Sequence, residues 1–181
     1  MIASKVLEGP VIETARLRLR IHQIADYADC CRLGSDPEAV RTIYVKPISP
    51  EDSWHRLMRF IGHWATLDYG LFIVEELATG QVIGQVGLAD FHRGLGDDFD
   101  PFPEFAWMLS EEVHGKGYAT EAAKAALDWM EAKFAPPRTV CIIDPTNAAS
   151  LRVAARLGYS VFGEAAYKEK TVLKLERVAV A

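Results

Sequence analysis

Alternating hydrophobic and polar positions mark the first expected strand, and helical spacing follows it. Residues 14–21 alternate apolar and basic side chains with a period of two, which predicts a half-buried strand with its leucines inward. Residues 26–33 are expected to form a short helix that Gly34 and Pro37 end. Pro50 and the acidic residues after it are typical of a helix start, and the apolar positions within 54–65 recur at helical spacing.

Strands and helices alternate through the rest of the chain. Gly80 lies between two apolar runs and predicts a hairpin turn. The expected strands cover residues 71–74, 82–88, 104–109, 139–143, 159–163 and 171–175, and the expected helices cover 118–134 and 149–157. No internal repeat or linker divides this pattern, so we expect a single mixed α/β domain over residues 1–181.

Composition and charge exclude several classes of protein. Of the 181 residues, 50% are hydrophobic and 25% are charged, as in ordinary globular proteins rather than disordered or fibrous ones. The formal net charge of −5 argues against a phosphate-backbone partner, so no nucleic-acid partner is expected. Cys30, Cys31 and Cys141 form neither a disulfide framework nor a metal-binding spacing, and Cys141 is expected in the core.

The start of the chain predicts where the protein works. Residues 1–10 contain no long apolar run, and no stretch of the sequence approaches the roughly 20 apolar residues that a membrane-spanning helix needs. Together with the sparse, unpatterned cysteines, this predicts a cytoplasmic protein with no membrane partner and no bound metal.

The segment from His114 to Ala122 is rich in glycine and lies between an expected strand and an expected helix. Glycines at such a junction let backbone N–H groups approach an anion, and the helix dipole favours negative charge there. A Walker A loop needs Ser or Thr after Gly-Lys, but Gly117 follows Lys116. A dinucleotide fingerprint needs a third glycine where Thr120 stands. The loop therefore predicts a phosphate site of another kind.

This loop and two further blocks resemble the GNAT acetyltransferases, in particular their ribosomal-protein N-acetyltransferase-like branch. The acetyl-CoA loop of that family reads Gln/Arg-x-x-Gly-x-Gly/Ala, and residues 114–119 are similar to it, with His114 at the first position. Residues 147–159 resemble the branch's segment Asn-x-x-Ser followed by Lys/Arg-Leu-Gly-Phe/Tyr, and residues 14–20 resemble its opening strand. The three blocks occur in the family's order over nearly the whole chain.

The resemblance implies a mixed α/β fold whose sheet is mostly antiparallel, with about six or seven strands and about four flanking helices. Strands 104–109 and 139–143 would splay apart, and the pantetheine of acetyl-CoA would lie in the gap. The backbone groups expected to pair with pantetheine are those of Met108, Leu109 and Ser110. The residues expected to hold the pyrophosphate are Gly115, Gly117, Tyr118 and Ala119, with Thr120 beside them.

The candidate catalytic residues are Glu104 and Ser150, because acetyl transfer needs a base for the ammonium proton and benefits from a proton for the departing thiolate. Glu104 stands where the family often carries a carboxylate, so it is either the general base, acting through water, or a solvated residue at a strand start. Ser150 either protonates the thiolate, contacts pantetheine or caps a helix. Asn147 either contacts pantetheine or caps that helix. Ala154 replaces the tyrosine that many relatives use as acid.

Basic residues near the loop are candidates for contacts with the cofactor's phosphates. His114 is either a phosphate ligand or an ordinary loop residue, and Lys116 and Arg156 either approach the phosphates or are solvated. Each of the three is therefore predicted as a cofactor contact, with a solvated position as the alternative.

The acceptor side of the site is less defined by the sequence. Trp54 belongs to an aromatic stripe at helical spacing, which either lines the acceptor site or belongs to the core. Asp97, Asp98 and Asp100 bring three carboxylates into one loop. These carboxylates either attract a protonated amine or basic peptide, or they belong to a solvated surface loop.

The sequence as a whole predicts an enzyme that moves an acetyl group from acetyl-CoA directly to a primary amine, without an acyl-enzyme intermediate. The acceptor would be a small-molecule or peptide amine, and a homodimer is compatible with the resemblance. The alternative is an acyl-CoA-binding regulatory module with degenerate catalysis. Ala154 and His114 favour this alternative, whereas Glu104 and Ser150 oppose it.

Overall fold

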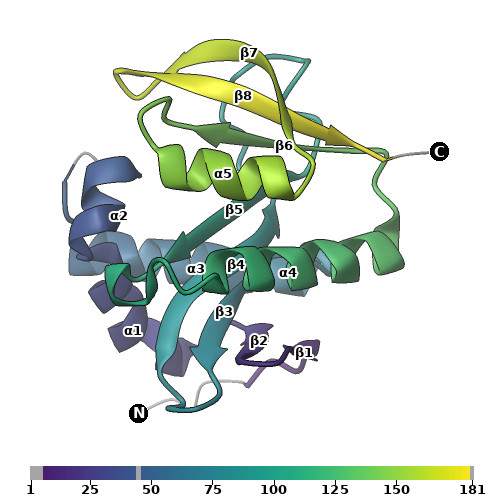
Figure 1. Ribbon diagram of the computed structural model, residues 1–181. Coiled ribbons are helices and arrows are strands. Elements are labelled where there is room, and N and C mark those ends of the chain that lie inside the picture. Colours follow the sequence, from purple (N-terminus) through teal and green to yellow (C-terminus); the bar gives the residue numbers. More distant parts are fainter. Residues whose placement is uncertain (1–5, 44–45, 180–181) are drawn as a thin grey trace.

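Strands from both halves of the chain form one sheet (Figure 1). The structure is a computed structural model, and it describes residues 6–43 and 46–179. Within these residues the strands are β1 Val11–Glu13, β2 Leu17–Ile21, β3 Leu71–Glu76, β4 Val82–Ala89, β5 Glu104–Leu109, β6 Arg138–Ile143, β7 Ser160–Tyr167 and β8 Lys170–Val178. Their order across the eight-stranded sheet is β1-β2-β3-β4-β5-β6-β8-β7. Neighbours run antiparallel in this described part, except that β5 and β6 are parallel.

Helices cover both faces of the sheet. In the described ranges the α-helices are α1 Tyr27–Gly34, α2 Pro37–Thr42, α3 Pro50–Leu67, α4 Tyr118–Phe134 and α5 Ala148–Arg156, and the short 3-10 helices are η1 Ile24–Asp26 and η2 Glu111–Val113. Figure 1 shows α4 crossing in front of β3 and β4, and α3 passing behind them. The main apolar cluster joins Leu19 of β2 and Phe72 of β3 to Ala122 and Ala126 of α4. The sheet is therefore held between two helical layers.

The starts of α3 and α4 follow from their local sequences. The Ser49 hydroxyl oxygen accepts a hydrogen bond from the backbone N–H of Asp52 at 3.0 Å, and Pro50 occupies the first turn of α3. Gly117 precedes α4 with a φ of 80°, a left-handed conformation that glycine adopts without a steric penalty. The first turn of α4 is therefore fixed directly after the glycine loop.

The predicted fold class and the splayed central strands are confirmed, and β5 and α4 have the predicted bounds. Two elements, β1 and α2, are not predicted by the sequence pattern. β1 has only three residues, and Pro37 begins α2, whereas the pattern suggests only a helix end there. Proline suits a first helical position because the N–H that it lacks would have no partner in the helix. The described residues accordingly form eight strands and five α-helices, slightly more than expected.

Two features of the described residues bear on the expected location and chemistry. No helix within 6–43 and 46–179 combines the length and apolar character that crossing a membrane requires. The same ranges contain no group of three or more His, Cys, Asp or Glu side chains that could hold a metal ion. Cys141 is 1% exposed, which confirms its predicted place in the core.

His22 is fully buried, and its burial makes stability depend on pH. Its Nδ1 lies 2.9 Å from the carbonyl oxygen of Leu71, and its ring packs 4.9 Å from that of Phe60. Burial lowers the pKa of His22 to about 4, from an ordinary value of 6.5. Between these two values the unfolded chain binds a proton that the folded chain excludes, so acid favours unfolding.

We expect the free energy of unfolding to fall as the pH is lowered from 6.5 toward about 4. The part due to His22 is about 3.5 kcal/mol at most, at about 1.4 kcal/mol per unit of pKa. His22→Asn keeps a donor near the Leu71 carbonyl but cannot titrate. Urea unfolding should be measured near pH 7 and near pH 5, a range over which histidine titrates. The free energy of unfolding should decrease less between these two pH values for the variant than for the wild type. Equal decreases for both proteins would contradict the assignment.

Candidate active site

The parallel pair of β5 and β6 opens into a cleft. In the described residues the two strands share one pair of register partners, Glu104 and Val140, and separate beyond it. Two adjoining cavities of about 630 Å³ and about 510 Å³ lie in the opening. We call the larger one, bordered by the β7–β8 turn, the hairpin cavity, and the smaller one, bordered by residues 114–120, the glycine-loop cavity. The residues that line both are Thr42, Ile43, Trp107, Asn147 and Ser150.

The glycine-loop cavity reaches the first turn of α4. Gly115 and Gly117 line it with φ angles of 76° and 80°. A Cβ atom added to Gly115 would meet no heavy atom within 4 Å, so open space faces the loop. The first N–H groups of α4 lack partners within the helix and lie at the positive end of its dipole. This arrangement suits a phosphate or another anion.

Arg16, in the turn between β1 and β2, supports the glycine loop. Its Nη1 donates to the carbonyl of Lys116 at 2.9 Å, and its Nε donates to the Glu121 carboxylate at 2.7 Å. The guanidinium lies 4.3 Å from the ring centroid of Tyr118. Glu121 also accepts a hydrogen bond from the Thr14 hydroxyl at 2.6 Å. Two of the sequence blocks that resemble the acetyltransferase family, far apart in the chain, are therefore in contact.

Alternate residues of β5 turn their backbone groups toward the cleft. The N–H of Ser110 donates at 2.8 Å to the carbonyl of Ile83, the second residue of β4. Because antiparallel pairing alternates along a strand, Met108 also directs its backbone groups to β4, whereas Trp107 and Leu109 direct theirs to the gap. The prediction that backbone groups of Met108 and Ser110 face the gap is therefore wrong, and Trp107 takes that place.

Most of the predicted cofactor residues border the glycine-loop cavity. They are Met108, Leu109, His114, Gly115, Gly117, Tyr118, Ala119, Thr120, Asn147, Ser150 and Arg156. Ser110 and Lys116 do not line it: the Ser110 hydroxyl donates to Asp36 at 3.2 Å, and the Lys116 side chain is exposed. The ring of His114 contacts the protein itself, because its Nε2 lies 3.1 Å from the carbonyl oxygen of Leu109.

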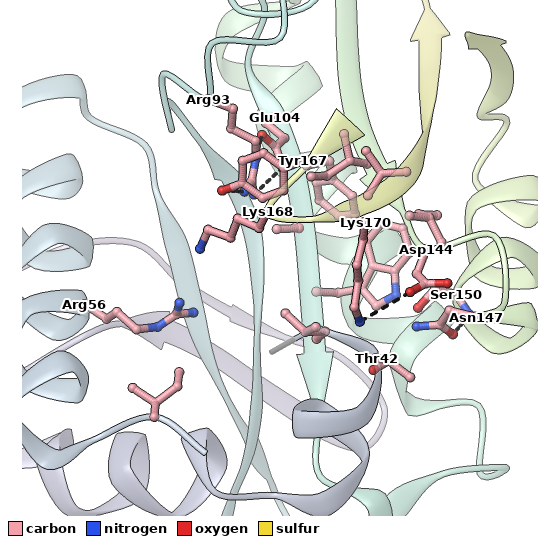
Figure 2. Close-up of a pocket in the computed structure, with 18 of the residues that line it drawn as sticks. Thr42, Arg56, Arg93, Glu104, Asp144, Asn147, Ser150, Tyr167, Lys168 and Lys170 are labelled. Atoms are coloured by element: carbon pink, nitrogen blue, oxygen red, sulfur yellow. Dashed lines mark hydrogen bonds and ion pairs between the residues drawn. The ribbon is translucent and has the colours of Figure 1, made fainter. Parts of the chain in front are cut away.

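Asn147 and Ser150 line both cavities and so lie at their junction. Figure 2 shows the two side chains next to each other in the hairpin cavity. The Oδ1 of Asn147 accepts a hydrogen bond from the backbone N–H of Ser150 at 3.0 Å, so Asn147 caps α5. The capping role predicted as an alternative for Asn147 is therefore confirmed, and it places the Ser150 side chain beside the cleft. Ala154 is fully buried on α5, so position 154 contributes nothing to the cleft.

Glu104 borders the hairpin cavity and is held by Arg93. The carboxylate is almost completely buried, and its two oxygens accept hydrogen bonds from Nε and Nη2 of Arg93 at 2.5 Å and 2.7 Å. The Nη1 of Arg93 donates to the Tyr167 hydroxyl at 2.8 Å (Figure 2). Burial raises the pKa of Glu104, while the hydrogen bonds from Arg93 act in the opposite direction. The alternative that Glu104 is a solvated residue is thus excluded.

Trp54 lies outside both cavities. Its ring packs edge-on against Tyr27 at a centroid distance of 5.6 Å. The residues of α3 that border the hairpin cavity are Asp52, His55, Arg56 and Arg59. Trp54 therefore does not border the cleft, because a different face of α3 is turned toward it.

The acidic loop also lies outside the cleft. Neither cavity is lined by Asp97, Asp98 or Asp100. The Asp98 carboxylate accepts a hydrogen bond from Lys174 at 2.6 Å, and that of Asp100 accepts one from the backbone N–H of Gly96 at 3.1 Å. The loop therefore does not border the cleft, and the carboxylates of Asp98 and Asp100 make hydrogen bonds within the local structure.

Several residues of the hairpin cavity are missed by sequence reasoning. They come from α3, from the loop before β5 and from the β7–β8 turn, and they include Arg56, Arg93, Tyr167, Lys168 and Lys170. Arg93 and Tyr167 are 74 positions apart in the chain yet share a hydrogen bond. No spacing or local motif marks these residues, so only the tertiary fold could have assembled them.

The parallel β5–β6 pair, the cleft and the glycine loop before α4 have a counterpart among known families. The family model described as an acetyltransferase (GNAT) domain matches residues 16–160. The chain belongs to the GNAT acetyltransferase family. As a GNAT enzyme it is an N-acetyltransferase. The matched region includes β5, α4 and β6, which contribute to the walls of the cleft.

Individual relatives agree with the family. The chain is 36% identical over 155 residues to the uncharacterized protein YkkB of Bacillus subtilis. The aligned region covers 80% of this chain and 82% of that protein. It is 38% identical over 61 residues to the spermidine N(1)-acetyltransferase of Escherichia coli, covering 34% of this chain and 33% of that enzyme. A solved Bordetella pertussis structure assigned to the GNAT-family acetyltransferases is 28% identical, with a TM-score of 0.86 over 93% of this chain and 99% of that one.

Proposed function

We propose that this GNAT enzyme transfers the acetyl group of acetyl-CoA directly to a primary amine inside the cleft between β5 and β6. The observation that carries the proposal is the meeting of the two cavities at Trp107, Asn147 and Ser150. One cavity ends at a loop suited to phosphates, and the other ends at a buried carboxylate. A thioester entering from one side would meet an amine entering from the other.

The residues present fit acetyl-CoA. Open space at Gly115 leaves room for a pyrophosphate against the backbone. The backbone groups of Trp107 and Leu109 that face the gap can pair with the amides of pantetheine as a neighbouring strand would. Bound in this way, acetyl-CoA would supply the activated acetyl group, and Ser150, which lines both cavities, would be available to its thioester.

The residues of the chain then serve the proton transfers. Glu104 accepts the ammonium proton of the acceptor through a water molecule, because each of its oxygens keeps a lone pair beyond the bond to Arg93. The amine nitrogen forms the new bond to the acetyl carbon as the carbon–sulfur bond breaks. The nitrogen then loses its second proton, which passes through the Ser150 hydroxyl at the cavity junction to the departing sulfur and gives the free thiol.

The acceptor is a small-molecule or peptide amine in this proposal. Spermidine is the substrate in the name of one relative, but that likeness covers only 34% of this chain. The likeness to the ribosomal-protein branch rests on the blocks at 14–20, 114–122 and 147–159 and selects no acceptor. The choice of acceptor must therefore come from the cleft itself.

Calorimetry and a thiol-release assay test the proposal together. We expect acetyl-CoA to bind in a one-to-one ratio, and coenzyme A release to require an added amine. Pooled amino acids, polyamines, amino sugars and short peptides serve as acceptors. Binding without amine-dependent thiol release would instead support the regulatory module, and absence of binding would remove the cofactor assignment.

A further inference from the structure

We infer that the acceptor amine carries an acidic group, a carboxylate or a phosphate, which the hairpin cavity recognises with cationic side chains. The inference rests on the proposed function, because it concerns the amine-binding half of the same cleft. It reverses the expectation from the sequence, in which an acidic loop attracts a cationic substrate.

The charge of the cavity lining carries this inference. Six cationic side chains line the hairpin cavity: Lys46, Arg56, Arg59, Arg93, Lys168 and Lys170. Three carboxylates line it as well: Asp52, Glu104 and Asp144. The chain as a whole has a formal net charge of −5, so this cationic excess is local. A concave surface with one excess sign concentrates ligands of the opposite sign.

Ion pairs within the lining do not remove the excess. Arg93 pairs with Glu104, and Lys170 lies 3.5 Å from the carboxylate of Asp144. Each of these pairs cancels one positive charge against one negative charge, so the sum over the lining stays positive. Figure 2 shows the tips of Arg56 and Lys168 reaching into the same cavity from α3 and from the β7–β8 turn.

The β7–β8 turn presents Lys168 in a conformation that the sequence does not favour. Tyr167 and Lys170 are register partners, so Lys168 and Glu169 alone make the turn. Their φ angles are 48° and 63°, in the left-handed region that asparagine and glycine usually occupy in two-residue hairpins. The turn therefore holds a lysine at the cavity wall at some cost in backbone strain, a pattern found at functional sites.

A cationic cavity also affects the chemistry of the amine. Neighbouring positive charges disfavour an ammonium group and lower its pKa, so deprotonation toward Glu104 becomes easier. A polyamine would add further positive charges to a lining whose net charge is already positive. An acceptor with its own carboxylate or phosphate gains attraction from Arg56 and Lys168 that offsets the repulsion.

Four amines that share an aminoethyl group test the inference on the wild-type enzyme. Besides this amine, β-alanine carries a carboxylate, phosphoethanolamine a phosphate, ethanolamine an uncharged hydroxyl and ethylenediamine a second amine. We expect kcat/KM for the better of the two acidic amines to exceed that for ethanolamine by about tenfold or more, with ethylenediamine lowest. The ratio between the two acidic amines then separates carboxylate from phosphate recognition.

Other orders of preference overturn the inference. A kcat/KM that is highest for ethanolamine or ethylenediamine would contradict it while leaving acetyl transfer intact. Thiol release with none of these four but with spermidine would contradict it as well. Failure to acetylate any amine, with acetyl-CoA bound, would end both this inference and the proposed function.

Charge reversal at Lys168 gives a second test. We expect Lys168→Glu to raise KM for the preferred acidic amine by about tenfold, to raise kcat/KM for ethylenediamine, and to leave KM for acetyl-CoA unchanged. Lys168→Gln should show a smaller effect and serves if the reversed variant does not fold. Lys124→Glu makes the same change on the exposed face of α4 and should leave every constant unchanged. Equal shifts for the reversal at Lys168 and at Lys124 would overturn the inference.

Discussion

Glu104→Gln is expected to lower kcat by about 10²- to 10⁴-fold, the range in which a general base contributes. The affinity for acetyl-CoA should stay nearly constant, because Glu104 borders the hairpin cavity and not the glycine-loop cavity. Glutamine keeps the shape and one oxygen acceptor for Arg93 but cannot take a proton. Steady-state kinetics with a saturating amine, combined with calorimetry for acetyl-CoA, measures both quantities.

Loss of the ion pair must be separated from loss of the base. Asp26→Asn provides the control, because Asp26 is buried to the same degree and its two oxygens accept hydrogen bonds from Arg20 at 2.7 Å and 2.8 Å. Both variants break a bidentate pair and should lower Tm, but only Glu104→Gln should lower kcat. An unchanged kcat for Glu104→Gln, or an equal loss in both variants, would remove Glu104 from the role of base.

Gly115→Ala is expected to raise KM for acetyl-CoA by about tenfold or more, which corresponds to a loss of at least about 1.4 kcal/mol of binding free energy. Its Cβ would point into the open space where the pyrophosphate is proposed to lie, with no protein atom within 4 Å. Thermal unfolding should show only the cost of a non-glycine residue at φ of 76°, about 1–2 kcal/mol.

Gly80→Ala is the matched control for this substitution. Gly80 lies in the β3–β4 turn with φ of 71°, and a Cβ there would also meet no heavy atom within 4 Å. It borders neither cavity. The two variants should therefore lose similar stability, while only Gly115→Ala weakens acetyl-CoA binding. Similar KM values for both variants would contradict the placement of the phosphates.

The parts of the fold that the sequence predicts well depend on local signals. The glycines before α4 and the prolines after it set the bounds of that helix, and the apolar run of β5 is correct to the residue. The glycine-loop cavity follows directly from these two elements. The residues of 108–120 that line this cavity lie close together in the chain, so a local pattern could point to them.

The hairpin cavity could not be predicted because long-range packing creates it. β8 pairs beside β6 in the sheet, and β7 pairs beside β8. This arrangement brings Tyr167 to Arg93 and Lys168 to the wall of the hairpin cavity. The sequence instead suggests an acidic acceptor site, because Asp97, Asp98 and Asp100 lie together in one loop. In the fold, Lys174 pairs with Asp98 of that loop, away from the cleft.

In the proposed reaction, acetyl-CoA and an amine react directly with each other in the cleft between β5 and β6. Incubation of the protein with acetyl-CoA carrying a deuterated acetyl group, followed by mass spectrometry of both protein and acceptor, tests it most directly. We predict that the acceptor gains one labelled acetyl group on its nitrogen and that the mass of the protein stays unchanged. A labelled protein, or an unlabelled acceptor in the presence of bound acetyl-CoA, would contradict direct transfer in this cleft.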